Sequence, residues 1–239
     1  MTNASSPFHR LDALALGAGL LRAVRFQEPT QPWQQSLREL SLEDLQGATQ
    51  TREAKLAFWI NVYNAYTQII LAKYPQDYGK ARFYTQPLAS IAGHPLSLDL
   101  IEHGILRRSQ FKYGLGYITW PWPNRLEKSL RVAKVDARIH FALNCGANSC
   151  PPIAFYEPEK LEAQLNLAAQ SYLTQTVRYD SSRNYLYLSP LMLWFRGDFG
   201  GRKGILDFLQ ALGLIEPGLR PRFRYLHYDW QPKPHYYSE

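Results

Sequence analysis

The sequence predicts an α+β fold that is mostly helical, with a small and mainly antiparallel sheet. Three observations predict it: helical patterns outnumber strand patterns, the strand-like segments are short, and the two kinds are interspersed along the 239 residues. With 46% hydrophobic and 20% charged residues, the chain can bury a full core. We expect an N-terminal helical extension over residues 1–50 and one α+β domain over residues 51–239.

The first third of the chain is predicted to be helical. Its expected elements are a loose tail over 1–10, a helix over 11–24, a proline-bearing connection over 27–35, a helix over 41–46 capped by Ser41, and a helix over 51–74. The last helix stops before Pro75, because proline disfavours the helical conformation of the residue before it. This helix is apolar nearly all round, so it should be central and buried.

The rest of the chain mixes helices with short strands. A loop over 76–95 precedes a helix over 97–108, capped by Ser97. The run over 113–124 is too rich in glycine and proline for a helix. The later elements are a helix over 125–133, a strand over 138–145, a helix over 158–174, a hairpin over 177–189 turning at 181–184, a helix from Ser189 and Pro190 ended by Gly200 and Gly201, a helix over 205–212, and a strand over 223–228.

Charge and hydropathy limit the classes of partner. The net charge is +7, but the lysines and arginines are spread from Arg10 to Lys233 without a dense cluster, so we expect no nucleic acid partner. The longest apolar segment, over 56–71, is interrupted by amides, and we predict no membrane span. The N-terminus lacks a signal-peptide pattern, which favours a cytoplasmic location.

Three side-chain amides interrupt the expected central helix. Asn61, Asn64 and Gln68 follow a three-then-four spacing that places them on one stripe, beside several alanines. Short side chains there leave room for another group. Either the backbone of a neighbouring element satisfies the amides, or they face a ligand. Both alternatives require polar contacts, because buried amides need partners.

A carboxylate breaks the apolar face of the helix expected over 97–108. Ile101 and Ile105 mark this face and Glu102 falls in its middle, where an unpaired charge is costly. Glu102 must therefore meet an arginine, a histidine or several donors, either in a structural ion pair or as the group that orients a catalytic histidine. His103 points about 100° away and is expected to be more exposed.

The stretch HFALNCGANSCPP, over 140–152, contains one histidine and both cysteines. A strand over 138–145 would place Cys145 in the core and His140 on the other face. Cys150 follows in a loop held by two prolines, from which its thiol can be presented towards His140. The alternative is a tight structural loop whose histidine satisfies backbone carbonyls.

Five ordered blocks resemble one known family. They are AFWINVYNAYT (57–67), SLDLIEHGILR (97–107), RIHFALNCGANSCPP (138–152), WFRGDFGG (194–201) and YLHYDW (225–230). They are similar to the bacterial and plant family catalogued as domain of unknown function number 547, over about residues 51–230. The resemblance implies signature positions rather than a reaction: Asn61, Asn64, Glu102, His103, Arg107, His140, Cys145, Ser149, Cys150, Pro151, Trp194, Asp198, Asp229 and Trp230. After YDW the chain departs from the family, with Gln-Pro-Lys in place of Ser-Leu-Asn.

Three classes of function stay open. A thiol enzyme for acyl transfer or amide hydrolysis would use Cys150 as nucleophile, His140 as base and Glu102 as orienting group, with the N–H groups of residues 146–149 for the oxyanion. Its expected binding residues are Asn61, Asn64, Gln68, His103, Arg107 and Ser149. A binding or scaffold module would use the same residues as a buried polar network. Metal or redox chemistry of the two thiols is the third class.

Geometry separates these classes. The enzyme requires Cys150 Sγ within about 4 Å of a His140 nitrogen, and the scaffold requires a buried Cys150 without a base. The redox class requires sulfurs bonded at about 2 Å. We predict no metal and no cofactor, because a C-x4-C spacing without a second pair is not a zinc pattern. The ligand or partner would be an undefined small molecule or protein.

Overall fold

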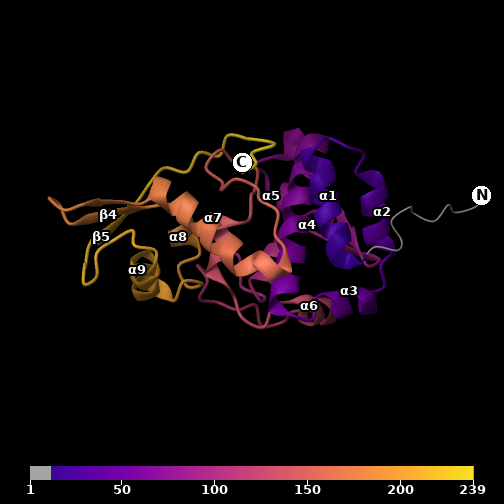
Figure 1. Ribbon diagram of the computed structural model, residues 1–239, viewed down its shortest axis with the longest axis horizontal. Coiled ribbons are helices and arrows are strands. Elements are labelled where there is room, and N and C mark those ends of the chain that lie inside the picture. The colour runs from indigo at the N-terminus through magenta and orange to yellow at the C-terminus, as the bar shows by residue number, and fades with distance from the viewer. Residues whose placement is uncertain (1–11, 239) are drawn as a thin grey trace, which may run out of the picture.

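The computed structural model describes residues 12–238 and confirms the α+β class (Figure 1). The α-helices are α1 (Ala13–Arg25), α2 (Gln31–Glu39), α3 (Leu42–Ala48), α4 (Arg52–Lys73), α5 (Ala81–Thr85), α6 (Arg125–Leu130), α7 (Leu161–Thr176), α8 (Leu191–Trp194) and α9 (Gly201–Ala211). Short 3-10 helices are η1 (Pro75–Asp77), η3 (Ala137–Phe141) and η4 (Pro158–Lys160), and η2 (Leu100–Leu106) is a π-helix. The strands are β1 (Ala89–Ile91), β2 (His94–Leu96), β3 (Arg178–Asp180), β4 (Tyr185–Leu188) and β5 (Arg222–Tyr225). The tail expected over 1–10 lies outside the described residues.

Two cores lie along the long axis of the molecule. At one end α1 packs along α4, which is central as expected, with Leu56 and Trp59 fully buried (Figure 1). At the other end the core lies between α7, α9 and β4, around Leu173, Leu186 and Leu209. Among residues 12–238, no helix has both the length and the hydropathy to cross a membrane.

The two sheets are small. β1 and β2 form an antiparallel ribbon in which Ser90 lies opposite Pro95. In the second sheet β4 is the middle strand, antiparallel to β3 and parallel to β5. The chain passes through α8 and α9 between β4 and β5, since a parallel pair requires a crossover connection. This excursion brings Asp198 into contact with Arg107 and His140, which come from earlier parts of the chain.

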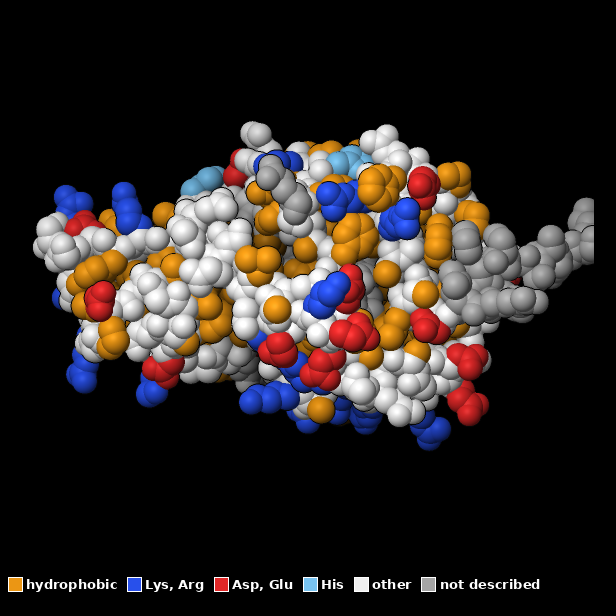
Figure 2. All heavy atoms as spheres, in the orientation of Figure 1, with side chains coloured by type: hydrophobic (Ala, Val, Ile, Leu, Met, Phe, Trp, Pro, Cys, Tyr) orange, Lys and Arg blue, Asp and Glu red, His pale blue; other side chains and the backbone are white. Residues whose placement is uncertain are grey.

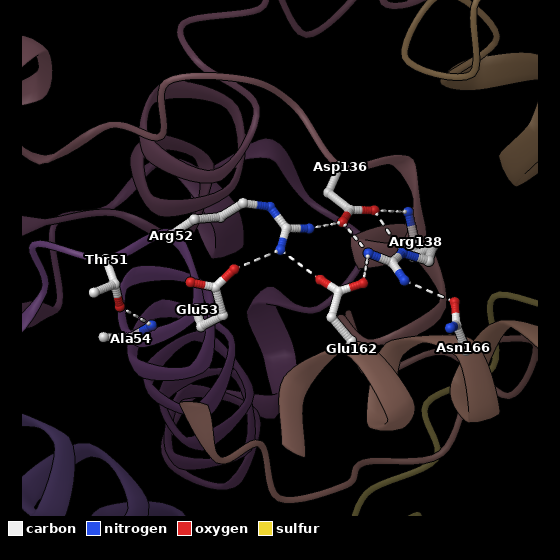
Figure 3. Close-up of polar contacts among 8 residues, drawn as sticks. All are labelled: Thr51, Arg52, Glu53, Ala54, Asp136, Arg138, Glu162 and Asn166. Atoms are coloured by element: carbon white, nitrogen blue, oxygen red, sulfur yellow. Dashed lines mark hydrogen bonds and ion pairs between the residues drawn. The ribbon is translucent and has the colours of Figure 1, made fainter. Parts of the chain in front are cut away.

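Charged side chains tie the start of α4 to two later segments. Arg52 lies between Glu53, Asp136 and Glu162, and Arg138 binds Asp136 and Glu162 from the other side (Figure 3). Asp136 precedes η3 and Glu162 lies in the first turn of α7, so the network joins three elements. Because several of these groups are open to solvent, the network contributes more to their placement than to stability.

Replacing the N-cap residue of α4 is expected to cost about 1 kcal/mol of stability. Thr51 Oγ1 accepts a hydrogen bond from the Ala54 N–H at 3.1 Å, and Thr51→Ala removes that acceptor (Figure 3). Urea unfolding should show the loss. The control is Thr174→Ala, at an exposed position in α7, which should change the free energy of unfolding by less than about 0.5 kcal/mol. Equal losses for both variants would contradict the capping role.

Three of the expected segments differ from the structure in where their helices and strands lie. The stretch over 27–35 contains the start of α2, and Pro32 is the second residue of this helix. Proline is tolerated there because an N–H in the first turn has no intrahelical acceptor. The loop expected over 76–95 contains α5, β1 and the start of β2. The helix expected from Ser189 shortens to α8, because the Gly197 N–H donates to Leu115 O instead of continuing a helix.

The strand expected over 138–145 is wrong. The segment forms η3 and a turn, in which the N–H groups of Ala142 and Leu143 both donate to Ile139 O. Its alternating apolar pattern has another cause: Ile139 packs into the first core and Phe141 into the second. The pattern therefore reflects a segment between two cores rather than one face of a sheet.

The helix expected over 97–108 is present as the π-helix η2. Ser97 Oγ accepts the Leu100 N–H at 3.1 Å, and the Arg107 N–H donates to the Glu102 carbonyl five residues back. The wider turn changes which side chains share a face, so the wheel argument that placed His103 towards solvent does not hold. Such turns are often found at functional sites.

Candidate functional site

A cavity of about 370 Å³ lies where α4, η2 and α8 meet the chain around the two cysteines. Its aromatic and apolar wall consists of Tyr63, Tyr84, Tyr113, Leu115, Leu143, Pro151, Leu191, Trp194, Phe195, Tyr228 and Trp230. Its ionisable groups are Asp99, Glu102, His103, Lys112, His140, Cys145 and Cys150. An apolar wall with a few convergent polar groups is the usual form of a small-molecule site.

His140 is held by a buried ion pair between Arg107 and Asp198. Arg107 Nε and Nη2 donate to the two carboxylate oxygens of Asp198 at 2.7 and 3.2 Å, and His140 Nε2 donates to Asp198 Oδ2 at 2.8 Å. The His140 ring stacks on Phe195, with centroids 3.8 Å apart. Because Nε2 carries the proton given to Asp198, the neutral ring has Nδ1 as a free acceptor.

Burial and the ion pair set the charges of this group. Burial raises the pKa of Asp198, but the hydrogen bonds and positive charges of His140 and Arg107 outweigh it and bring that pKa to about 2. Burial lowers the pKa of His140 below its ordinary value, even though Asp198 opposes this. At neutral pH Asp198 is therefore an anion and His140 a neutral base.

Glu102 does not orient His140, contrary to the hypothesis from sequence. Glu102 Oε2 accepts a hydrogen bond from the Tyr63 hydroxyl at 2.9 Å, and Oε1 lies 3.7 Å from His103 Nδ1. Burial raises the pKa of Glu102, but the charges of His103, Arg107 and His140 and the Tyr63 hydrogen bond outweigh burial and lower it. Asp198 occupies the place that had been assigned to Glu102.

His103 lies in the cavity wall rather than in solvent. Arg107 Nη1 donates to His103 Nδ1 at 2.9 Å, and His103 Nε2 lies 3.7 Å from Asp99, which also binds Lys112 at 2.8 Å. Burial lowers the pKa of His103, in keeping with an unprotonated Nδ1 that accepts from Arg107. Arg107, expected to contact a ligand, lies behind the wall and supports its two histidines.

The two thiols form a close pair in the cavity wall. Cys150 Sγ accepts the Cys145 N–H at 3.1 Å and lies 2.8 Å from Cys145 Sγ and 3.3 Å from the Tyr228 hydroxyl oxygen. Both cysteines are free, since a disulfide bond is about 2 Å long. Cys150 is buried and Cys145 partly exposed, the reverse of the expectation, because the strand on which that expectation rested is absent.

The donors around Cys150 favour its ionised form. Burial raises the pKa of the Cys150 thiol, but hydrogen bonds from the Cys145 thiol, the Tyr228 hydroxyl and the Cys145 N–H outweigh burial and lower it. The hydrogen bond to Cys150 and burial raise the pKa of Cys145, and burial raises the pKa of Tyr228. Cys145 and Tyr228 therefore stay protonated and can donate to Cys150 when it ionises.

The sequence profile of one family, described as "Protein of unknown function, DUF547", matches residues 48–173. That is more than half of the 239 residues. The chain belongs to the DUF547 family. The matched region holds α4, η2 and both cysteines, whereas Asp198 and Tyr228 lie beyond it, so the resemblance of the blocks over 194–201 and 225–230 stays a prediction. No curated protein and no solved structure matches this DUF547 chain.

No hydrogen bond joins Cys150 to His140 among residues 12–238, although both line the cavity. In this DUF547 protein the cysteine is stabilised by Cys145 and Tyr228, and the histidine is oriented by Asp198. The sequence predicted a direct pair of Cys150 and His140. The structure instead has two separate groups that line one cavity, Cys150 with its donors and His140 with Asp198. Within the described residues, no group of three or more His, Cys, Asp and Glu side chains is arranged to hold a metal ion.

The three amides of α4 bind backbone groups and do not line the cavity. Their partners are the C=O and N–H of Tyr156 for Asn61, the C=O of Ala142 and the N–H of Asn144 for Asn64, and the N–H of His235 for Gln68. For Asn61 and Asn64 the first of the two alternatives is observed, since backbone groups of a neighbouring segment satisfy both amides. Gln68 fits it only in part, because its Nε2 is buried without a hydrogen-bond partner among the described residues. Of the three, Asn64 fixes the turn that carries His140 and the cysteines.

Three of the four N–H groups expected to bind the oxyanion already have partners within the protein, and the fourth, that of Ala147, lies close to the two thiols. The N–H groups of Gly146, Asn148 and Ser149 all donate within the protein, to Asn144 Oδ1, Gln231 O and Asp229 O. Ser149 Oγ accepts the Asp229 N–H at 2.8 Å, which anchors the turn to the C-terminal segment. Ser149 lines a second cavity of about 140 Å³, which also reaches Cys150.

Sequence reasoning missed the aromatic part of the DUF547 site. Tyr63 lies between two of the amides that were singled out, and Phe195 and Tyr228 lie beside signature positions. The clustering of aromatic residues around isolated polar ones is the signal that would have found them. Asp198 was predicted only from the family resemblance, because no local sequence pattern identifies it as the partner of a histidine.

Proposed function

We propose that this DUF547 protein is a thiol-dependent enzyme that transfers or hydrolyses an acyl group bound in the 370 Å³ cavity. One observation carries the proposal: a cysteine whose surroundings favour the thiolate and a histidine held as a neutral base line the same cavity. Thiolate and base are the two groups that acyl transfer through a thioester requires.

Each group has a separate role in the proposed reaction. Cys150 Sγ attacks the acyl carbonyl carbon, a C–S bond forms, and the alcohol or thiol leaving group departs with a proton from solvent. His140 Nδ1 then takes a proton from the water or acceptor alcohol that cleaves the thioester, and Cys150 leaves as thiolate. Asp198 stabilises the imidazolium formed in this step, at 2.8 Å from Nε2.

The cavity wall suits an acyl group with a substantial apolar part. Aromatic rings and leucines form most of the wall, so an aliphatic or aromatic acyl chain would be desolvated there. Lys112 is the cation on the wall and already pairs with Asp99. Because the reaction needs reduced thiols, we also propose a cytoplasmic location.

The decisive experiment is to trap the acyl-enzyme. The wild type, Cys150→Ala and His140→Ala are incubated with p-nitrophenyl esters of several chain lengths, and intact mass is measured. We expect His140→Ala to accumulate an acyl adduct on Cys150, because the base that activates water is gone, and Cys150→Ala to form none. Turnover by wild type should rise with pH through a value below the ordinary 6.5 of histidine, since the neutral ring is the active form.

Thiol reactivity provides the matched chemical test. The alkylation rate of Cys150 against pH should have a midpoint below the ordinary value of about 8.5, and Tyr228→Phe or Cys145→Ala should shift it upwards by removing a donor. Tyr225→Phe, on β5, is the control for Tyr228→Phe. If Cys150 titrates as a free thiol and no ester gives an adduct, the enzyme proposal is wrong.

The second candidate is a binding module without catalysis. It is favoured by one observation, the lack of any hydrogen bond between Cys150 and His140 within the described residues. Under this alternative the Arg107, Asp198 and His140 group stabilises the wall of a ligand site. Saturable binding of an acyl compound, with no adduct in any variant and an ordinary Cys150 titration, would establish the module in place of the enzyme.

A further inference from the structure

Segment 111–122 exposes a concentration of large apolar side chains. Seven of the eleven exposed large hydrophobic residues within the described chain lie in it, and Trp122 and Tyr113 are 77% and 75% exposed. The other four include Phe26, Leu167 and Leu226, which lie in separate parts of the sequence. Single exposed apolar residues are normal, but a contiguous group marks an interaction surface.

The segment is held in place rather than loosely tethered. The Phe111 N–H donates to Ile118 O at 2.7 Å, and the Trp120 N–H donates to Ser109 O at 2.6 Å. Gly116 packs against the Asp198 backbone so closely that a Cβ there would lie 2.5 Å from the Asp198 nitrogen. The exposed rings are therefore presented by a fixed loop that is built on the residue holding His140.

Unpaired cations accompany these rings. Residues 108–134 contain six Lys and Arg residues and one acidic residue, Glu127, which is buried. Among the described residues, four of the six cations have no ion pair or side-chain hydrogen bond; they are Arg108, Arg125, Lys128 and Lys134, and all four are exposed. Arg125 and Lys128 lie on α6, at the lower edge of Figure 1, where Figure 2 shows Lys and Arg side chains.

From this combination we infer that segment 111–122, together with α6, binds the headgroup region of an anionic lipid bilayer. Tryptophan and tyrosine rings have an apolar body and a polar edge, which suits the boundary between headgroups and acyl chains. The unpaired cations attract anionic lipid. A protein partner is less well matched, because the centres of protein interfaces are depleted of lysine.

Segment 111–122 also borders the 370 Å³ cavity. Tyr113 and Leu115 belong to segment 111–122 and also line the 370 Å³ cavity. A bilayer bound by the segment would therefore lie beside the cavity, and an amphiphile could pass from lipid to the apolar wall. Lipid binding itself does not depend on the proposed acyl chemistry, and sedimentation with vesicles measures it without turnover.

The test is co-sedimentation of the full chain with vesicles of phosphatidylcholine alone or mixed with phosphatidylglycerol. We expect binding to the mixed vesicles only. Trp122→Ala should weaken binding at least about fivefold, because it removes a ring that the bilayer would bury. Arg125→Gln and Lys128→Gln should each weaken it by roughly fivefold, and added salt should do the same. Leu167→Ala, at a 70% exposed position on α7, is the matched control and should bind as wild type.

Three results would overturn the inference. The first is no sedimentation with mixed vesicles, including the case where Trp122→Ala instead abolishes a concentration-dependent dimer, which would assign the surface to a second copy. The second is equal binding of Trp122→Ala and wild type, and the third is equal binding to both vesicle types. Thermal unfolding of each variant should match wild type, because Trp122, Arg125 and Lys128 are exposed.

Discussion

Asp198→Ala is expected to lower the free energy of unfolding by about 3–5 kcal/mol. Both Arg107 and Asp198 have completely buried side chains, and the carboxylate accepts from Arg107 at 2.7 Å and from His140 at 2.8 Å. The variant leaves the guanidinium in the interior without its counter-charge, which costs more than the loss of the attraction itself. Urea unfolding followed by far-UV circular dichroism measures the change.

An exposed ion pair provides the matched control for Asp198→Ala. Lys203 and Asp207 are four residues apart on α9 with largely exposed side chains, so Asp207→Ala should cost less than about 0.5 kcal/mol. The double variant Arg107→Met, Asp198→Leu removes both buried charges and should recover part of the loss. A loss for Asp198→Ala as small as that for Asp207→Ala would mean that Arg107 finds another counter-charge.

The same carboxylate predicts an acid-dependent loss of stability. The pKa of Asp198 is about 2 in the folded protein, below its ordinary 3.8, so its contribution is present above about pH 4. That contribution is lost as pH falls towards 2, and it amounts to about 2 kcal/mol. Asp198→Asn cannot titrate, so its stability should fall less steeply than that of wild type between pH 4 and 2.

The helices could be predicted because their signals are local. Ser41 caps α3 as its sequence position indicates, and the apolar pattern over 51–74 identifies the buried helix. The segment over 138–145 could not be predicted, since its alternation comes from packing between two cores that form only in the tertiary structure. Local periodicity does not distinguish one sheet face from two separate partners.

The site was predictable in part for a related reason. Polar residues that break an apolar pattern, such as Glu102 and His140, can be found without a structure because burying them requires a partner. The identity of the partner is a tertiary property: Asp198 lies 58 residues from His140, and Tyr63 lies 39 residues from Glu102. Sequence reasoning therefore located the groups that need partners and assigned the wrong one to His140.

Asn64→Ala is expected to cost about 2–5 kcal/mol, because it leaves two buried backbone groups without partners. The Asn64 side chain donates to Ala142 O and accepts from the Asn144 N–H, both at 2.9 Å, and it is completely buried. In the alanine variant, a water molecule could satisfy these two backbone groups only by entering the core. Urea unfolding measures the loss, and Asn166→Ala, at an exposed position on α7, is the control and should lose less than about 1 kcal/mol.

Asn64→Ala also tests whether α4 positions the thiols. The two backbone groups that Asn64 binds lie on either side of Leu143, between His140 and Cys145, so the variant should loosen the turn that gives Cys150 its donors. We expect the alkylation midpoint of Cys150 to rise towards 8.5 in Asn64→Ala and to stay at the wild-type value in Asn166→Ala. A destabilised Asn64→Ala protein whose Cys150 titrates as in wild type would restrict the role of Asn64 to stability. The thiolate would then depend on Cys145 and Tyr228 alone.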